Sequence, residues 1–236
     1  MNPDESKALV ELKDVVKIYQ QGNVEVHALR GLTFKVLTGE FSAICGPSGS
    51  GKTTALNMIG ALDSPTSGSV VVEGRNLASL SRKTLSRIRR DRIGFVFQAY
   101  NLIPVLTAYE NAEIVMSLQG KSQEERHARV MGLLDEVGLK EMAHRRPYEL
   151  SGGQQQRVAI ARAIASGPAV VLADEPTANV DSDTADKLLA LMEKLNQDRG
   201  VTFIFSTHDP KVMARAKRII RLVDGRIVDD KSWEAV

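Results

Sequence analysis

The sequence has one cysteine, few aromatic residues and no long hydrophobic run. A single cysteine excludes an internal disulfide and suits a reducing compartment. Because Cys45 follows the apolar residues FSAI, we expect it to be a small core residue. No apolar run approaches the roughly 18–20 residues that cross a bilayer, and the polar start MNPDESKALVELKD is unlike a secretory signal. We therefore expect no disulfide framework, membrane span or leader.

The charge balance also limits the partners. The formal net charge is +2, which is too small to indicate a nucleic-acid partner, and we expect none. The basic run from Arg82 to Arg92 has no interleaved aromatic residues, unlike a base-stacking surface. A solvated helix face is our first interpretation of this run, and contact with anionic lipid is the alternative.

The apolar pattern predicts an α/β fold. The first 80 residues alternate or cluster apolar residues as strands do, and AVVLADEP and VTFIFSTHD look like strands covered on both faces. The helical stretch SDTADKLLALMEKLNQDRG connects them, which favours a mostly parallel sheet. With 236 residues, one domain is expected, with residues 1–86 and 167–236 forming the core and its β-rich N-terminal subdomain. Residues 87–166 then form an inserted α-helical subdomain.

A phosphate-binding loop is predicted at GPSGSGKT, from Gly46 to Thr53. The stretch fits G-x-x-x-x-G-K-[ST] and lies between an expected strand and an expected helix. Its glycines let backbone N–H groups turn toward phosphate oxygens, and the helix adds its positive N-terminal end. We expect Lys52 to reach the β- and γ-phosphates and Thr53 to bind Mg²⁺ through its hydroxyl.

Two acidic residues and a histidine end the apolar strands. Asp174 and Glu175 follow VVLA, and His208 follows FIFST. Ligands of open α/β sheets bind at the carboxyl ends of strands, so these side chains are expected at the phosphate loop. Asp174 can hold a Mg²⁺-bound water, Glu175 can orient or deprotonate the attacking water, and His208 can bind a γ-phosphate oxygen. The other histidines, His27, His127 and His144, are expected at the surface.

The stretch LSGGQQQR at residues 150–157 has no evident local purpose. Two glycines at the head of a helix cost stability, and three glutamines in a row are expected to bury nothing. Ser151 is a good N-cap residue, and a free helix N-terminus is an anion site that glycines leave open to a phosphate.

The order of these motifs resembles the nucleotide-binding domain of ABC (ATP-binding cassette) proteins. GPSGSGKT, FVFQ, LSGGQ, LADEPT, NVD and STHD follow one another over nearly the whole chain. The resemblance implies a P-loop NTPase (RecA-like) core that hydrolyses ATP with Mg²⁺. It implies an adenine-stacking role for Tyr19, a Q-loop role for Gln98 as a sensor of Mg²⁺ and water, a D-loop role for Asp181 and a switch role for His208. The implied nucleotide-binding residues are Tyr19, Gly46, Pro47, Ser48, Gly49, Ser50, Gly51, Lys52, Thr53 and Thr54. The implied catalytic residues are Glu175, His208 and Gln98, and the implied metal site is Thr53, Gln98 and Asp174.

The resemblance also implies partners. Ser151, Gly152, Gly153 and Gln154 would face the ATP of a second copy in a head-to-tail homodimer. An integral membrane permease would dock near Gln98–Glu110, placing the chain at the cytoplasmic face of the inner membrane. Internal packing is an equal alternative for Leu102 and Ile103.

Within the family, NLIPVLTAYENA and RRPYELSGGQQQRVAIARA look most like the lipoprotein-release, macrolide-export and cell-division group. This similarity implies export or extraction of an envelope substrate. The alternative is a non-transport ATPase that regulates a membrane or divisome partner through ATP-gated dimerisation.

Overall fold

The computed structural model describes residues 8–232, so the first seven residues of the polar N-terminus lie outside it. Its strands are β1 (Val10–Gln21), β2 (Val24–Val36), β3 (Phe41–Cys45), β4 (Ser67–Val72), β5 (Arg75–Asn76), β6 (Ile93–Val96), β7 (Val170–Asp174), β8 (Thr202–Thr207), β9 (Arg218–Val223) and β10 (Arg226–Ser232). Its α-helices are α1 (Lys52–Ile59), α2 (Arg82–Arg92), α3 (Ala108–Leu118), α4 (Gln123–Glu136), α5 (Gly152–Ala165), α6 (Ser182–Arg199) and α7 (Pro210–Arg215). Short 3₁₀ turns cover Leu77–Ser79, Lys140–Met142 and Pro147–Glu149.

The strands form two sheets. The four-stranded sheet, in the order β2-β1-β4-β5, is antiparallel and is made by the N-terminal part of the chain. The six-stranded sheet has the order β10-β9-β3-β8-β7-β6, and only the β9–β10 pair is antiparallel. The α/β fold with a mostly parallel sheet and a β-rich N-terminal part is therefore confirmed. Strand β6 pairs with β7 in this sheet, although it lies within residues 87–166.

The central strands β3, β7 and β8 of the six-stranded sheet are buried on both faces because they are apolar at nearly every position. Ile44, Leu172 and Ile204 pack on one face with α1 and the four-stranded sheet. Ala43, Ala173 and Phe205 pack on the other face with residues of α5, α6 and α7. Cys45, at the end of β3, is 5% exposed, and burial raises the pKa of its thiol. The expectation of a small core cysteine is confirmed.

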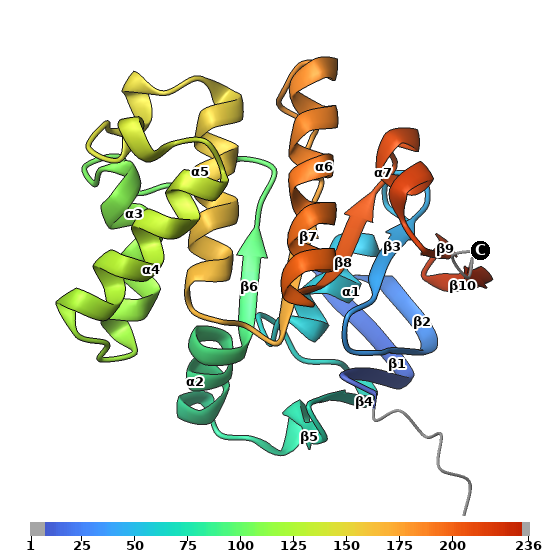
Figure 1. The fold of residues 1–236 in the computed structure, drawn as a ribbon. Coiled ribbons are helices and arrows are strands. Elements are labelled where there is room, and N and C mark those ends of the chain that lie inside the picture. The colour runs from blue at the N-terminus through green and yellow to red at the C-terminus, as the bar shows by residue number, and fades with distance from the viewer. Residues whose placement is uncertain (1–7, 233–236) are drawn as a thin grey trace, which may run out of the picture.

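Helices α3, α4 and α5 form a layer at one side of the molecule, away from β1 and β2 (Figure 1). Thr107 and Ser122 cap α3 and α4, each in a reciprocal box with the glutamate three residues later. The inner faces of α3, α4 and α5 share one apolar cluster with the sheet. Within residues 8–232, none of the helices has the length and apolar character that a membrane span requires.

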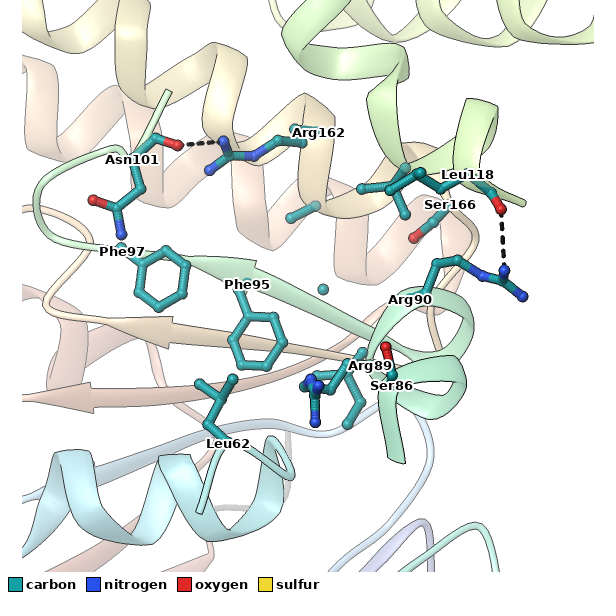
Figure 2. Close-up of a pocket in the computed structure, with 14 residues that line it drawn as sticks. Leu62, Ser86, Arg89, Arg90, Phe95, Phe97, Asn101, Leu118, Arg162 and Ser166 are labelled. Atoms are coloured by element: carbon teal, nitrogen blue, oxygen red, sulfur yellow. Dashed lines mark hydrogen bonds between the residues drawn. The ribbon is translucent and has the colours of Figure 1, made fainter. Parts of the chain in front are cut away.

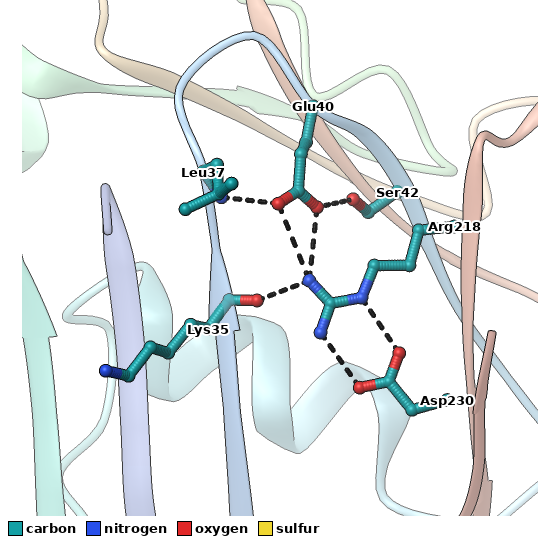
Figure 3. A network of polar contacts seen from close by, with 6 residues as sticks. All are labelled: Lys35, Leu37, Glu40, Ser42, Arg218 and Asp230. Carbon is teal, nitrogen blue, oxygen red and sulfur yellow. Dashed lines mark hydrogen bonds and ion pairs between the residues drawn. The ribbon is translucent and has the colours of Figure 1, made fainter. Parts of the chain in front are cut away.

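Arg218 ties the C-terminal strands to the N-terminal ones (Figure 3). From β9 it donates two 2.8 Å hydrogen bonds to the carboxylate of Asp230 on β10 and one of 2.6 Å to Lys35 O on β2. The same guanidinium lies 3.3 Å from the carboxylate of Glu40, which also accepts from Leu37 N–H and the Ser42 hydroxyl. The side chain of Arg218 is only 18% exposed, so this network is part of the fold rather than of its surface.

The basic helix α2 is exposed over its first residues, and its last arginines are engaged. Arg90 pairs with Asp91, Arg92 pairs with Glu73, and Arg89 donates to Ala61 O. The solvated face expected for Arg82–Arg92 is present over the first residues and at Arg87, and the paired Arg90 and Arg92 side chains remain partly exposed.

Candidate nucleotide-binding site

The phosphate loop connects β3 to α1, as its sequence context predicts. Gly51 is the N-cap of α1 and has a φ of 100°, which favours glycine. A Cβ there would lie 2.6 Å from Ala28 O on β2. Because a glycine cannot cap the helix with a side chain, the first N–H groups of α1 face the loop as an uncapped anion site.

Lys52 lies inside the loop that it is expected to serve. It is 8% exposed, and its ammonium donates to Gly46 O at 2.9 Å and Pro47 O at 3.0 Å. Ser50 Oγ is buried without a hydrogen-bond partner among the described residues. The loop thus holds a positive charge and polar groups around a space that suits phosphate oxygens.

Thr53 and Asp174 meet at the end of β7, although they are 121 residues apart. The Thr53 hydroxyl donates to Asp174 Oδ1 at 3.1 Å. A hydroxyl beside one carboxylate is a donor set that suits Mg²⁺, which takes few protein oxygens and fills its remaining positions with phosphates and waters. No cluster of three His, Cys, Asp or Glu side chains occurs among residues 8–232 that would hold a metal by itself.

Glu175 and His208 are in direct contact. His208 Nδ1 lies 2.6 Å from Glu175 Oε1, and the Thr207 hydroxyl donates to Glu175 Oε2 at 3.2 Å. Glu175 has a φ of 45°, and its N–H donates to Ser206 O on β8. The carboxylate is 15% exposed and the imidazole 70% exposed, so a largely buried carboxylate is paired with an accessible imidazole.

A cleft lies over the loop and collects most of the residues predicted for the site. The members predicted from the sequence are Pro47, Ser48, Gly49, Gly51, Lys52, Thr53, Thr54, Gln98, Glu175 and His208. The cleft is also lined by Val26, His27, Ala28 and Ala178, which the sequence analysis missed. His127 and His144 are exposed as expected, and His27 is exposed but borders the cleft.

Tyr19 lies beside the cleft rather than in its lining. On β1 it pairs with Val26 of β2, and Val26 lines the cleft. The Tyr19 hydroxyl donates to Asp63 Oδ2 at 2.9 Å. Burial, and then the adjacent Asp63 carboxylate, raise the pKa of Tyr19, so the ring is neutral at any pH of interest.

Residues 151–154, here called the signature residues, form the capped N-terminus of α5. The Ser151 hydroxyl accepts from Gln154 N–H at 3.3 Å, and Gln154 Oε1 accepts from Ser151 N–H at 2.9 Å. The expected N-cap at Ser151 is therefore confirmed, with Gln154 closing the box. None of the residues from 151 to 154 lines the cleft over this chain's own phosphate loop.

The expectation that the three glutamines bury nothing is wrong. Gln156 is fully buried, and its Nε2 donates to Pro176 O at 2.6 Å, with Phe97 O at 3.5 Å. Gln155 donates to Leu150 O at the head of its own helix. Gln156 therefore connects the signature helix to the residues on either side of the cleft.

The two signature glycines also serve contacts within the chain. A Cβ on Gly153 would lie 2.3 Å from the Thr184 methyl, and one on Gly152 would lie 2.7 Å from the Tyr100 hydroxyl. That hydroxyl donates to Asn179 O at 3.0 Å. Close packing against α6 and the Gln98 loop thus requires glycine here, in addition to any approach of a phosphate.

Asp181 is the N-cap of α6. Its carboxylate accepts from Thr184 N–H at 2.9 Å and from the Thr184 hydroxyl at 2.7 Å. These hydrogen bonds lower the pKa of Asp181. Within this chain the D-loop aspartate therefore organises its own helix, next to Gly153.

Comparisons with known proteins show the family of this chain. The ABC transporter family matches residues 29–178. The lipoprotein-releasing system ATP-binding protein LolD of Anaeromyxobacter dehalogenans is 50% identical over 222 residues, covering 94% of this chain and 93% of the relative. The macrolide export ATP-binding/permease protein MacB of Hyphomonas neptunium is 48% identical over 94% of this chain, which spans 34% of that longer protein.

A solved structure has the same fold. The dimeric ATP-binding cassette MJ0796, bound to ADP and Pi in a post-hydrolysis state, matches with a TM-score of 0.88 and 44% identity, covering 96% of this chain and all of that one. MJ0796 comes from Methanocaldococcus jannaschii. With this fold, this phosphate loop and these relatives, the chain belongs to the ABC transporter family, as an ATP-binding ATPase.

Proposed function

We propose that two copies of this chain bind two ATP molecules head to tail and drive a separate membrane permease. Each ATP lies between the phosphate loop of one copy and residues 151–154 of the other. The permease exports or extracts an envelope substrate, and the chain works at the cytoplasmic face of the inner membrane. Two relatives support export or extraction: one belongs to a lipoprotein-releasing system, and the other is a macrolide export ATP-binding/permease protein.

The position of the signature helix carries this proposal. Residues 151–154 form the N-terminus of α5, where the helix dipole favours an anion, and yet they line no part of this chain's own cleft. The nucleotide they can serve is therefore one held by another molecule. The dimeric form of MJ0796, 44% identical to this chain, supports the same arrangement.

Hydrolysis then needs one base and a fixed charge distribution. Glu175 accepts a proton from the attacking water, while His208 and Thr207 hold its carboxylate in place. Lys52 and the first N–H groups of α1 stabilise the charge on the phosphates. Gln98 borders the same cleft, where it orients the water.

Mg²⁺ completes this site in our proposal. Thr53 and Asp174 would hold it. Gln98 lines the same cleft as Thr53 and would sense the ion. When bound there, Mg²⁺ would supply positive charge beside the phosphates of the nucleotide.

The permease docks, in our proposal, beside the Gln98 loop. A groove there lies between the sheet edge and the helical layer, with the rings of Phe95 and Phe97 directed toward Leu62 (Figure 2). Leu118, on its far wall, is 65% exposed. The remaining lining includes Arg89, Arg90 and Arg162. Apolar walls with arginines suit a permease helix that carries apolar and acidic side chains.

The segment after Gln98 is held in a fixed shape for this contact. Asn111 is buried, and its side-chain oxygen accepts from Ile103 N–H. Its amide nitrogen lies within hydrogen-bond distance of Ile103 O, Leu106 O and Thr107 O, so the segment is held at several points. Arg162 donates to Tyr100 O and Asn101 O, two residues with positive φ. Leu102 packs against the core, whereas Ile103 is 37% exposed, so Ile103 is the better docking residue.

We propose further that residues 87–166 respond to docking as a unit, except for β6, which stays with the sheet. The helices α3, α4 and α5 contact one another extensively, which supports a common movement. Gln156 and Arg162 on α5 connect that unit to the cleft and to the Gln98 loop.

Trapping the dimer tests the proposed function. Glu175→Gln removes the base and keeps the side-chain volume, so ATP should accumulate in an uncleaved dimer. We expect this variant to elute as a dimer with ATP and as a monomer without it, measured by size exclusion with light scattering. Lys52→Ala is the control and should stay monomeric with ATP, because it loses the ammonium at the phosphates. Turnover by Glu175→Gln without dimerisation would refute the proposal.

Docking has a separate test. Leu118→Arg places a charge in the groove without touching the cleft, and Leu37→Arg, at a 37% exposed site between β2 and β3, is the matched control. We expect Leu118→Arg to keep its basal ATPase and to lose membrane association in cells, as measured by cofractionation with membranes. Equal membrane association of both variants would place the docking surface elsewhere.

A further inference from the structure

Beside the nucleotide cleft, the side chain of Tyr19 is held by two residues to which no role has been given. Lys17 and Tyr19 lie two positions apart on β1, so their side chains share one face of the strand. Asp63 follows α1, in the turn between Ile59 and β4. The Asp63 carboxylate bridges the pair, accepting from Lys17 Nζ at 2.8 Å and from the Tyr19 hydroxyl at 2.9 Å.

The lysine covers one side of the tyrosine ring. Its ammonium lies 4.7 Å from the ring centroid, a cation–π distance. It also donates to Ser64 O at 2.8 Å, and its side chain is only 13% exposed. With one ring face covered and the hydroxyl bonded, the ring is held at two points, and the face opposite Lys17 is the one left for a ligand.

The charge state of the pair fits this role. Burial alone would raise the pKa of Asp63, but the hydrogen bonds from Lys17, Ser64 N–H and Tyr19 outweigh it and lower that pKa. Asp63 is therefore a carboxylate at neutral pH. It neutralises Lys17 and leaves a net uncharged support beneath the ring.

We propose that Lys17 and Asp63 are positioning residues for the nucleotide base, fixing the Tyr19 ring so that its free face stacks on adenine. This inference rests on the proposed stacking role of Tyr19. A ring fixed before binding loses less conformational entropy when the base arrives, so the gain is in affinity and not in turnover. Neither residue lines the cleft over the phosphate loop.

A different set of contacts holds the backbone around the ring. Thr66 N–H donates to Val16 O at 2.8 Å, and the Thr66 hydroxyl accepts from Ile18 N–H at 3.0 Å. These bonds attach the turn to β1 without using Lys17, Asp63 or the ring. Thr66→Val removes the hydroxyl bond at nearly constant volume and is therefore a matched control for a purely structural role.

The test compares a ligand that has a base with one that lacks it. Calorimetric titration of the full chain measures the Kd of ADP and of pyrophosphate for wild type, Lys17→Met, Asp63→Ala, Tyr19→Ala and Thr66→Val. We expect Tyr19→Ala to raise the Kd of ADP roughly tenfold, as loss of one stacked base does. Lys17→Met and Asp63→Ala should raise it roughly threefold, consistent with the loss of a cation–π contact or one hydrogen bond. Pyrophosphate affinity should be unchanged in all of them, and Thr66→Val should bind ADP as wild type does.

Combined variants complete the test. In a Tyr19→Ala background, Lys17→Met and Asp63→Ala should cause no further loss, because no ring is left to position. The inference is overturned if either single variant binds ADP normally, weakens pyrophosphate equally, or keeps its full effect without the ring. An equal loss in Thr66→Val also overturns it. If Tyr19→Ala itself binds ADP normally, the proposed stacking role fails, and this inference fails with it.

Discussion

Gln156, in the signature helix, donates a 2.6 Å hydrogen bond to the carbonyl of Pro176, the residue that follows Glu175. The glutamine is fully buried, and its Nε2 also lies 3.5 Å from Phe97 O, next to Gln98. One side chain thus joins α5 to the two segments that carry Glu175 and Gln98. If residues 151–154 complete the ATP site of a second copy, as proposed, this contact connects that site directly to the chain's own cleft.

Gln156→Met should separate these segments while nearly preserving volume. Losing the bond leaves Pro176 O unpaired in a buried place, so we expect the free energy of unfolding to fall by about 1–2 kcal/mol. The kcat for ATP should fall because the residue after Glu175 is less firmly held, with a smaller change in KM. Gln155→Met is the control, since Gln155 bonds only Leu150 O, and it should keep wild-type turnover. Similar kinetics in both variants would contradict the account.

Gly153→Ala should be destabilising because of one methyl group. Its Cβ would lie 2.3 Å from Cγ2 of Thr184, whose hydroxyl donates to the Asp181 carboxylate. Thr184→Ser removes that methyl and keeps the hydroxyl, so the double variant should recover most of the lost thermal stability. If residues 151–154 complete the ATP site of a second copy, as proposed, the ATPase activity of the double variant should remain low, because the added Cβ would obstruct that ATP. Full recovery of activity would show that Gly153 serves packing alone.

Removing Arg218 should weaken the whole fold. Arg218→Ala leaves the carboxylates of Asp230 and Glu40 without their partner at a site that is mostly buried. We expect a loss of about 2–3 kcal/mol in the free energy of unfolding, measured by urea denaturation. Lys231→Ala is the control, because its pair with Asp229 is largely exposed, and it should change stability by less than about 0.5 kcal/mol. Equal effects would mean that the network adds nothing beyond a surface pair.

Glu73 should make part of the stability depend on pH. Its hydrogen bonds with Arg92 lower the pKa of Glu73 in the folded state. The folded state therefore favours the carboxylate, and this stabilisation is present above the unfolded pKa of about 4.3 and is lost as pH falls through the folded value. Glu73→Gln should be less stable than wild type at pH 6.5, with the gap shrinking below about pH 4 in urea titrations. If the difference in stability between wild type and Glu73→Gln grew on acidification, the folded state would not be lowering the pKa of Glu73.

Much of the site follows from short sequence patterns. Hydrophobic strands that end in Asp174, Glu175 and His208, together with a glycine loop before α1, place their side chains at one sheet edge because parallel strands share that edge. The buried strands β3, β7 and β8 were predictable for the same reason: they are apolar at nearly every position.

The supporting contacts could not be found in this way. Gln156 looks like one of three polar residues, and its partners Phe97 and Pro176 lie far away in sequence. Lys17 and Asp63 carry no motif, and their shared contact depends on how a turn folds back on β1. His27 and Val26 border the cleft only because of the register in which β2 pairs with β1, which the apolar pattern leaves open.

Complementation between two inactive variants tests the central claim, that each ATP site is completed by a second copy. Lys52→Ala lacks a working phosphate loop, and Ser151→Arg obstructs the signature, so neither should hydrolyse ATP alone. In a head-to-tail dimer of the two, one site combines the intact loop of one chain with the intact signature of the other. Each mixed dimer keeps one intact site of two, so the mixture should regain ATPase activity, up to about one half of the wild-type value when every chain is in a mixed dimer. A mixture as inactive as its separate components, with both variants folded by circular dichroism and shown to form mixed dimers, would contradict the account.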